Sequence, residues 1–177
     1  ERKLSDYPML VIPGGFSYGD ALGAGRLWAN DLYHRLSEPL GRFVEAGKPV
    51  LGICNGFQVL VKAGYLPGPA PVQRVTLTFN HSGHFECRWV RLRPFATSRC
   101  LFTHDLDEEI LCPVAHGEGR LAVPDESTRR ELWDKGLVAL QYVAPRSVAT
   151  QGHAGYPANP NGSVDDIAGL CNETGNV

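Results

Sequence analysis

The stretch PVLGICNGFQ, residues 49–58, joins an apolar run directly to a helical pattern. Residues 49–53 are apolar without a break and predict a strand that is buried on both faces, as in parallel sheets. Phe57, Leu60 and Val61 follow at spacings of three and one, which predicts a helix ending near Gly64. The sequence therefore places a sharp strand-to-helix turn at Cys54.

Residues 52–56 have the pattern G-x-C-x-G, which is a nucleophile elbow with Cys in place of Ser. A strand that turns sharply into a helix crowds the residues on both sides of the turn, and glycine relieves that contact. The start of a helix favours a thiolate on Cys54, and the N–H of Asn55 would point toward a developing oxyanion. The alternative is that Cys54 is a small buried apolar residue. The strand before it and the helix after it favour the nucleophile.

A second buried strand, residues 9–12, ends in Pro13-Gly14-Gly15. If this strand is the parallel neighbour of the first, the loop lies beside Cys54, where Gly14 and Gly15 allow close approach of a bound acyl group. Gly15 could then supply a second oxyanion N–H. The alternative is an ordinary turn at the end of a strand. Residues 16–20 either contact a ligand or partner, or cap the following helix through Asp20.

The order of elements predicts an α/β fold with a parallel sheet, because strand, helix, strand and helix follow with short links. The first helix covers residues 32–44 and divides near Pro39, with Ser37 as the N-cap of its second part. Beyond residue 72 the apolar residues alternate. Further strands are predicted at residues 75–79, 86–92, 110–115 and 137–142, with a helix at 127–135 and a loop-rich tail from 156 to 176.

The composition is that of a globular chain of 177 residues with 43% hydrophobic residues and a net charge of −2. This balance argues against electrostatic binding to nucleic acid or to a membrane surface. No apolar run approaches the roughly 20 residues of a membrane helix. Five cysteines without a C-x-x-C pair indicate a reduced, cytoplasmic protein and no zinc ribbon. The absence of Met at position 1 suggests that the numbering begins inside a longer gene product.

Four motifs occur in order along the chain: PGGFSYGD at 13–20, GICNGFQ at 52–58, HGEGR at 116–120 and YPANPNGS at 156–163. In these motifs the chain resembles the glutaminase component (PurQ type) of phosphoribosylformylglycinamidine synthase, a class I glutamine amidotransferase. The resemblance runs from about Leu10 to Val177. It implies a flavodoxin-like three-layer sandwich with a mostly parallel central sheet, here as an incomplete single domain over residues 1–177.

The resemblance also implies a reaction, in which Cys54 attacks the side-chain amide of glutamine, ammonia leaves and water hydrolyses the thioester. It assigns the oxyanion hole to Gly15 and Asn55, and substrate binding to Gly14, Gln58 and His116. The implied partners are a PurL-type synthetase subunit or domain, with a small PurS-type subunit as a further candidate. No cofactor is expected in this domain, because the synthetase uses the ATP and Mg²⁺. The competing enzyme class is a ThiJ/PfpI-type cysteine hydrolase or glyoxalase, and a non-catalytic docking module is a third interpretation.

The general base is the part of this site that the sequence lacks. In the family a His-Pro-Glu sequence completes the triad shortly after the segment that matches residues 169–177, and a first strand precedes the segment that matches Glu1. We therefore expect a fragment that does not turn over glutamine. His116 and Glu118 have the same H-x-E spacing as that pair, so they are either a catalytic pair, a loop at the pocket or partner surface, or a plain turn.

Two further groups are less informative. His81, His84 and Cys87 stand three residues apart but lack a fourth ligand, so a loop is favoured over a zinc site. The Asn-Pro-Asn-Gly sequence at 159–162 predicts a rigid turn with no catalytic role.

Overall fold

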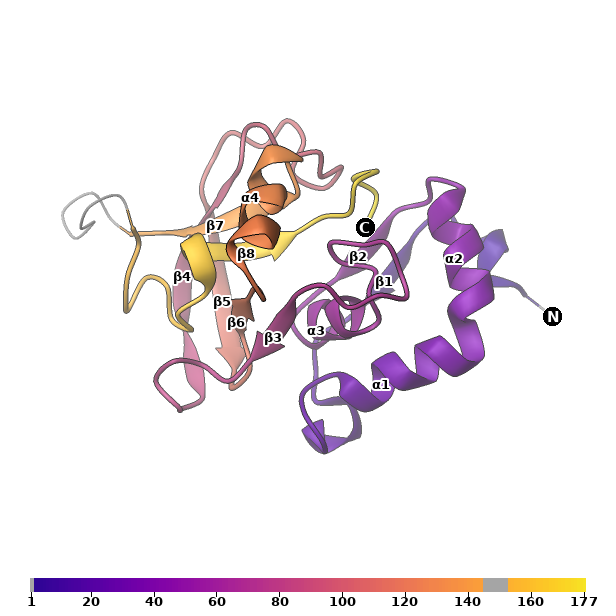
Figure 1. Ribbon diagram of the computed structural model, residues 1–177, viewed down its shortest axis with the longest axis horizontal. Coiled ribbons are helices and arrows are strands. Elements are labelled where there is room, and N and C mark those ends of the chain that lie inside the picture. Colours follow the sequence, from indigo (N-terminus) through magenta and orange to yellow (C-terminus); the bar gives the residue numbers. More distant parts are fainter. Residues whose placement is uncertain (1, 145–152) are drawn as a thin grey trace.

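The protein is described by a computed structural model that covers residues 2–144 and 153–177. The N-terminal part is a two-stranded parallel sheet with helices around it (Figure 1). Strand β1 (Leu10–Ile12) pairs with β2 (Val50–Gly52), so the two strands end side by side. Helix α3 (Asn55–Lys62) packs on both strands and on α1 (Arg26–Asp31). This arrangement puts the loops that follow β1 and β2 at one edge of the sheet.

The C-terminal part is built from antiparallel strands. A four-stranded sheet has the order β5-β4-β7-β8, formed by β4 (Glu86–Pro94), β5 (Ile110–His116), β7 (Val138–Val143) and β8 (Ile167–Leu170). A separate pair joins β3 (Thr76–Thr78) to β6 (Arg120–Ala122). Helix α4 (Glu126–Asp134) begins after Asp125, whose side chain accepts the Thr128 N–H.

The α/β class is confirmed, but the expected mostly parallel sheet is not. Among the described residues, parallel pairing is confined to β1 and β2, and the largest sheet is antiparallel. The physical reason is visible in β4, where buried residues such as Val90 and Leu92 alternate with exposed ones such as Arg91. A strand with one solvent-exposed face is typical of an antiparallel sheet, whereas the strands of parallel sheets are buried on both faces.

The helix that contains Pro39 differs from the prediction at its start. Three segments follow one another without a break: α1, a π-helical turn (Leu32–Leu36) and α2 (Ser37–Glu45). Leu36, not Ser37, is the N-cap of α2, and Pro39 lies in its first turn as expected. Proline has no N–H to donate and its ring crowds the carbonyl four residues earlier, so an irregular turn just before it is the expected response.

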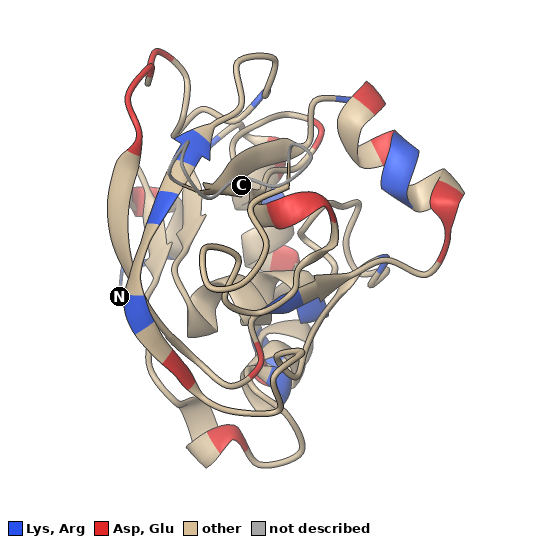
Figure 2. Ribbon diagram, turned by 90° about the vertical axis from the view of Figure 1, so that its left-hand side faces the viewer, with Lys and Arg blue, Asp and Glu red and all other residues tan. Residues whose placement is uncertain are grey.

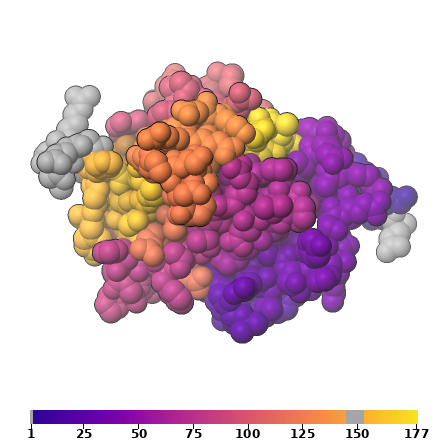
Figure 3. Space-filling view, in the orientation of Figure 1, coloured from indigo at the N-terminus to yellow at the C-terminus, as the bar shows by residue number. Residues whose placement is uncertain are grey.

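One apolar core joins the two parts of the molecule. Buried residues from the parallel part, such as Ile12 and Leu60, belong to the same cluster as Leu121, Leu137 and Ile167 from the antiparallel part. The space-filling view shows the two parts in continuous contact (Figure 3). The core therefore holds the edge of the parallel sheet at a defined place against the antiparallel part.

Charges of both signs are spread over the described elements (Figure 2). None of the described helices combines the length and the apolar character that crossing a membrane would require.

Candidate active site

The turn between β2 and α3 is a strained elbow centred on Cys54. Its backbone has φ 51° and ψ −107°, a conformation that residues with a side chain rarely adopt. Such a residue costs about 1–3 kcal/mol and persists only where its surroundings impose it. Cysteine is nevertheless present there, and its thiol is exposed. Strain at an exposed nucleophilic group is typical of catalytic turns.

Two glycines make the elbow possible by leaving room for close backbone contacts. A Cβ on Gly56 would lie 1.9 Å from the Ile12 carbonyl oxygen, and a Cβ on Gly52 would lie 2.6 Å from Leu60. The glycines of G-x-C-x-G therefore have the steric role that the pattern predicted.

The Pro-Gly-Gly loop lies beside the nucleophile, as the parallel pairing predicted. The N–H of Ile53 donates to the Ile12 carbonyl at 3.0 Å and extends the contact of β1 and β2 up to the elbow. A Cβ on Gly14 would lie 3.3 Å from the Cβ of Cys54 and 4.0 Å from its Sγ. The structure thus brings Gly14 and Cys54 together from two separate loops.

Two backbone amides at the elbow have no protein acceptor within the described part of the chain. Asn55 is the first residue of α3, where amides lack an intrahelical acceptor, and Gly15 follows Gly14 in the neighbouring loop. Neither N–H donates a hydrogen bond to backbone or side chain among the described residues. Both amides therefore keep an N–H that is not used within the described residues.

The thiol of Cys54 is adjacent to the end of β5. Its Sγ lies 3.7 Å from the Ala115 carbonyl oxygen, which accepts the S–H. Within residues 2–144 and 153–177, no imidazole or carboxylate forms a hydrogen bond with this sulfur. A base for the thiol is thus not part of the described arrangement.

Side-chain hydrogen bonds connect the elbow to two loops. Asn55 Oδ1 accepts the Ser17 N–H at 3.2 Å, and its Nδ2 donates to Gln58 Oε1 at 2.9 Å. Gln58 Nε2 donates in turn to the Glu118 carbonyl at 2.8 Å. Asn55 and Gln58 are both buried, so this chain of bonds is shielded from water. It holds the loops at Ser17 and Glu118 against α3.

A cavity of about 130 Å³ lies next to the thiol at the junction of the two parts. It brings together several of the sequence-predicted residues with others that the prediction missed. Its lining consists of Gly15, Phe16, Asp20, Ala24, Cys54, Gln58, Phe79, Phe85, Ala115, His116, Gly117 and Glu118. The cavity therefore joins Cys54, Gly15, Gln58 and His116 in one place.

One wall of this cavity is acidic. Burial raises the pKa of Asp20, and the nearby charge of Glu118 raises it further. Asp20 Oδ1 is buried without a hydrogen-bond partner in the described residues, while Glu118 Oε1 accepts the Ala24 N–H at 3.1 Å. Because Gly25 is the N-cap of α1, the capping role considered for Asp20 is wrong. Burial lowers the pKa of Lys62, which lies close to both carboxylates.

His116 and Glu118 do not form an imidazole–carboxylate pair. The two ring nitrogens of His116 face Asn80 and Asn161, and the Glu118 carboxylate bonds to the Ala24 amide instead. Burial lowers the pKa of His116 below its ordinary value. His116 nevertheless lies in the cavity wall, which agrees with the interpretation of residues 116–120 as a loop at the pocket.

The sequence analysis missed the role of two asparagines in this wall. Asn80 is 3% exposed and Asn161 is fully buried, and both bond to His116. Asn161 belongs to the turn at 159–162 that was expected to be purely structural. The only signal in the sequence was the presence of asparagines in segments rich in turn residues.

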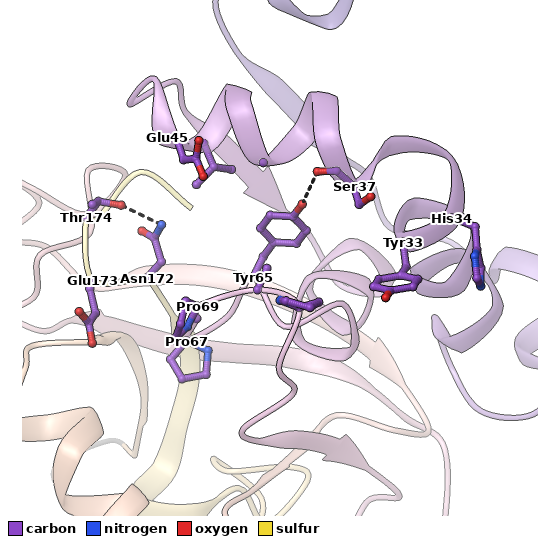
Figure 4. Close-up of a pocket in the computed structure, with 15 residues that line it drawn as sticks. Tyr33, His34, Ser37, Glu45, Tyr65, Pro67, Pro69, Asn172, Glu173 and Thr174 are labelled. Atoms are coloured by element: carbon purple, nitrogen blue, oxygen red, sulfur yellow. Dashed lines mark hydrogen bonds between the residues drawn. The ribbon is translucent and has the colours of Figure 1, made fainter.

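A cavity of about 680 Å³, larger than the one beside Cys54, lies elsewhere in the described residues. It is lined by α2, the proline-rich segment at 67–71 and the segment at 172–174, with Tyr65 reaching toward Ser37 (Figure 4). Cys54 does not line it. Size therefore does not identify the reactive site here.

Comparison with known proteins agrees with the motifs. Residues 1–177 match the CobB/CobQ-like glutamine amidotransferase domain. Phosphoribosylformylglycinamidine synthase subunit PurQ from Treponema denticola is 50% identical over 192 residues, covering all of this chain and 70% of the relative. PurQ from Dehalococcoides mccartyi is 44% identical over 99% of this chain and 66% of the relative.

A solved structure gives the same result. A chain of the PurLQS structure from Thermotoga maritima matches with a TM-score of 0.71 at 34% sequence identity, covering all of this chain and 68% of that one. The chain thus spans about two thirds of the length of these relatives. On this evidence the chain belongs to the CobB/CobQ-like glutamine amidotransferase family, as a homologue of the PurQ subunits.

Proposed function

We propose that the chain is the glutaminase part of a phosphoribosylformylglycinamidine synthase and supplies ammonia from glutamine for de novo purine biosynthesis. The observation that carries this proposal is the strained, exposed Cys54, near the Gly15 and Asn55 amides that have no acceptor among the described residues, in a chain half identical to a PurQ subunit. A hydrolase or glyoxalase of the ThiJ/PfpI type is not favoured, because the relatives are PurQ subunits.

The chemistry follows from the elbow. The thiolate of Cys54 attacks the side-chain amide carbon of glutamine, and the carbonyl oxygen becomes an oxyanion that accepts from the N–H groups of Gly15 and Asn55. The C–N bond then breaks, and the nitrogen takes up a proton and leaves as ammonia. Water adds to the thioester in the second half-reaction, releasing glutamate and the free thiol.

Substrate contacts are assigned to the walls of the small cavity and to Gly14, which lies beside Cys54. The Gly14 backbone is close enough to Cys54 to contact the acyl group. Gln58 uses one N–H and one lone pair for protein contacts, which leaves a second N–H and a second lone pair for glutamine. His116 contributes to substrate binding through the position of its loop.

The general base is expected from outside the described arrangement, because Cys54 has no imidazole partner there. The resemblance places a His-Pro-Glu sequence in the segment after Val177. The Val50 N–H donates to the Asn176 carbonyl at 2.7 Å, so this part of the chain already runs beside β2.

The partner proposed for this chain is a PurL-type synthetase, with a small PurS-type subunit as a further candidate. Three exposed aromatic residues, Phe16, Phe79 and Phe85, line the small cavity. Exposed apolar groups of this kind are typical of protein contacts. A synthetase that covers them would receive ammonia directly.

Four further expectations belong to this proposal. The domain needs no cofactor of its own, since the synthetase uses the ATP and Mg²⁺, and its location is cytoplasmic. Residues 1–177 form one amidotransferase domain, and β1 and β2 belong to a larger parallel sheet of flavodoxin-like type in the full-length protein.

The test is alkylation by a diazo-oxo-norleucine-type glutamine analogue in the full-length protein with its synthetase partner. Peptide mapping by mass spectrometry should find the label on Cys54 and not on Cys87, which is also exposed. Glutamine should protect Cys54, and Cys54→Ala should remove the label. Equal labelling of Cys54 and Cys87 without protection, or turnover of a 2-oxoaldehyde, would contradict the proposal.

A further inference from the structure

The buried amide of Asn80 has one possible orientation. Its Nδ2 donates to the His84 and His116 carbonyls, both at 2.8 Å, which uses both of its hydrogens. Its Oδ1 accepts the Gly119 N–H at 3.1 Å and lies 3.2 Å from His116 Nδ1. An amide oxygen can only accept, so the hydrogen between these two atoms belongs to Nδ1 of His116.

The amide of Asn161 fixes the other ring nitrogen in the same way. Its Oδ1 accepts the Ser163 N–H at 2.9 Å and the Ser163 hydroxyl at 2.7 Å. Its Nδ2 therefore faces the Tyr142 hydroxyl at 3.0 Å and His116 Nε2 at 3.5 Å. Because an NH₂ group only donates, Nε2 has to be the acceptor and carries no hydrogen. The ring is neutral, in the Nδ1–H tautomer.

The position of this ring decides the position of the loop behind Cys54. A Cβ on Gly119 would lie 2.5 Å from the imidazole, so the ring is folded back onto its own loop. The Ala115 carbonyl next to His116 accepts from Cys54 Sγ, and the Glu118 carbonyl accepts from Gln58. The first contact joins the elbow to the end of β5, and the second joins it to the loop after β5, which Asn80 and Asn161 hold through His116.

We propose that Asn80 and Asn161 hold His116, at the end of β5, as a neutral Nδ1–H imidazole, and that this cluster positions residues 117–118 as part of the wall of the glutamine cavity. The inference rests on the proposed function for the identity of the substrate. His116 is a positioning residue here and not the base of Cys54, because its one lone pair is directed at the Asn161 amide.

The surroundings oppose a second proton on the ring. Burial lowers the pKa of His116, and the charge of Glu86 on β4 opposes this effect only in part. An added N–H at Nε2 would also face the NH₂ group of Asn161. Tyr142, on β7, reaches Asn161 as a neutral phenol, since burial raises its pKa to about 12.

The first test is the tautomer itself, measured by nitrogen-15 NMR of the histidines in the full-length protein, with His116→Gln to assign the signal. We expect that Nδ1 of His116 is protonated and that its Nε2 is unprotonated at pH 7. Asn161→Asp replaces the donor with a carboxylate, which should protonate Nε2 and raise the pKa of His116. Asn172→Asp is a matched control, because Asn172 is also buried but bonds to Thr174 and Asn176. An Nε2–H tautomer or an imidazolium in the wild type, or an unchanged pKa in Asn161→Asp, would overturn the assignment.

The second test separates positioning from catalysis in the full-length complex. We expect His116→Ala to lower kcat/KM for glutamine by about 10- to 100-fold, mainly through KM, since misplacement of a wall by about 1 Å has effects of this size. Alkylation of Cys54 by the glutamine analogue should persist. Loss of alkylation to the level of Cys54→Ala would make His116 catalytic and overturn the positioning role. The NMR result does not depend on activity, so failure of the proposed function and failure of the tautomer assignment give different outcomes.

Discussion

Replacing Cys54 with glycine should make the protein more stable, although it removes the thiol that we propose as the nucleophile. Cys54 has φ 51° and ψ −107°, and such backbone strain costs about 1–3 kcal/mol. Glycine adopts this conformation freely, but it increases the entropy of the unfolded chain at a cost of about 0.5–1 kcal/mol. The thiol is exposed, so little packing is lost. The difference between these two effects predicts that Cys54→Gly raises the free energy of unfolding by about 1 kcal/mol.

This gain is measurable by calorimetry or by urea unfolding of the full-length protein. For a chain of this size, about 1 kcal/mol corresponds to a Tm higher by roughly 2–4 °C. Cys54→Ser keeps a side chain on the strained backbone and should change stability little. Cys87→Gly is the matched control in regular strand β4, where glycine should destabilise by about 0.5–1 kcal/mol. If Cys54→Gly lowers stability as much as Cys87→Gly, the elbow is not strained and this reasoning is wrong.

Two other predictions concern the scaffold. Gly56→Ala should destabilise the protein by about 3 kcal/mol or more, because its Cβ would lie 1.9 Å from the Ile12 carbonyl oxygen. Gly41→Ala is the control and should not destabilise it, because a Cβ at Gly41 would meet nothing within 4 Å. Thermal melts followed by circular dichroism will compare the two variants. The lowered pKa of the Glu131 carboxylate should make the free energy of unfolding decrease at acidic pH. Arg74 and Lys135 hold its pKa at about 2, against an ordinary value of 4.5, so its contribution is complete above pH 4.5 and is lost as the pH falls toward 2. Urea unfolding should show a shallower decline for Glu131→Gln over this range, and parallel curves would contradict the assignment.

The local parts of the site could be predicted from the sequence. The elbow at Cys54 and the neighbouring Pro-Gly-Gly loop follow from two buried apolar runs, each ended by glycines, and the parallel pairing of β1 and β2 confirms their proximity. Neighbours in sequence determine these features, because strand burial and turn sterics act within a few residues.

The parts that depend on distant contacts could not be predicted. The hydrogen bonds from Asn80 and Asn161 to His116 join residues 36 and 45 positions apart, and no local pattern marks such an asparagine. The same limit explains the missed strands β6 and β8, which are only three and four residues long and are recognisable by their partners. A mostly parallel sheet is not confirmed for the described residues, because the strand at residues 86–92 alternates between buried and exposed residues and pairs antiparallel in the largest sheet.

The central claim is that Cys54 carries the acyl group of glutamine. Mass spectrometry of the full-length protein with its synthetase partner, quenched in acid during turnover of glutamine, tests it most directly. The account predicts a glutamyl thioester on the peptide that contains Cys54, which disappears with hydroxylamine and is absent in Cys54→Ala. Turnover of glutamine by Cys54→Ala at the wild-type rate, or an acyl group found on a different residue, would contradict it.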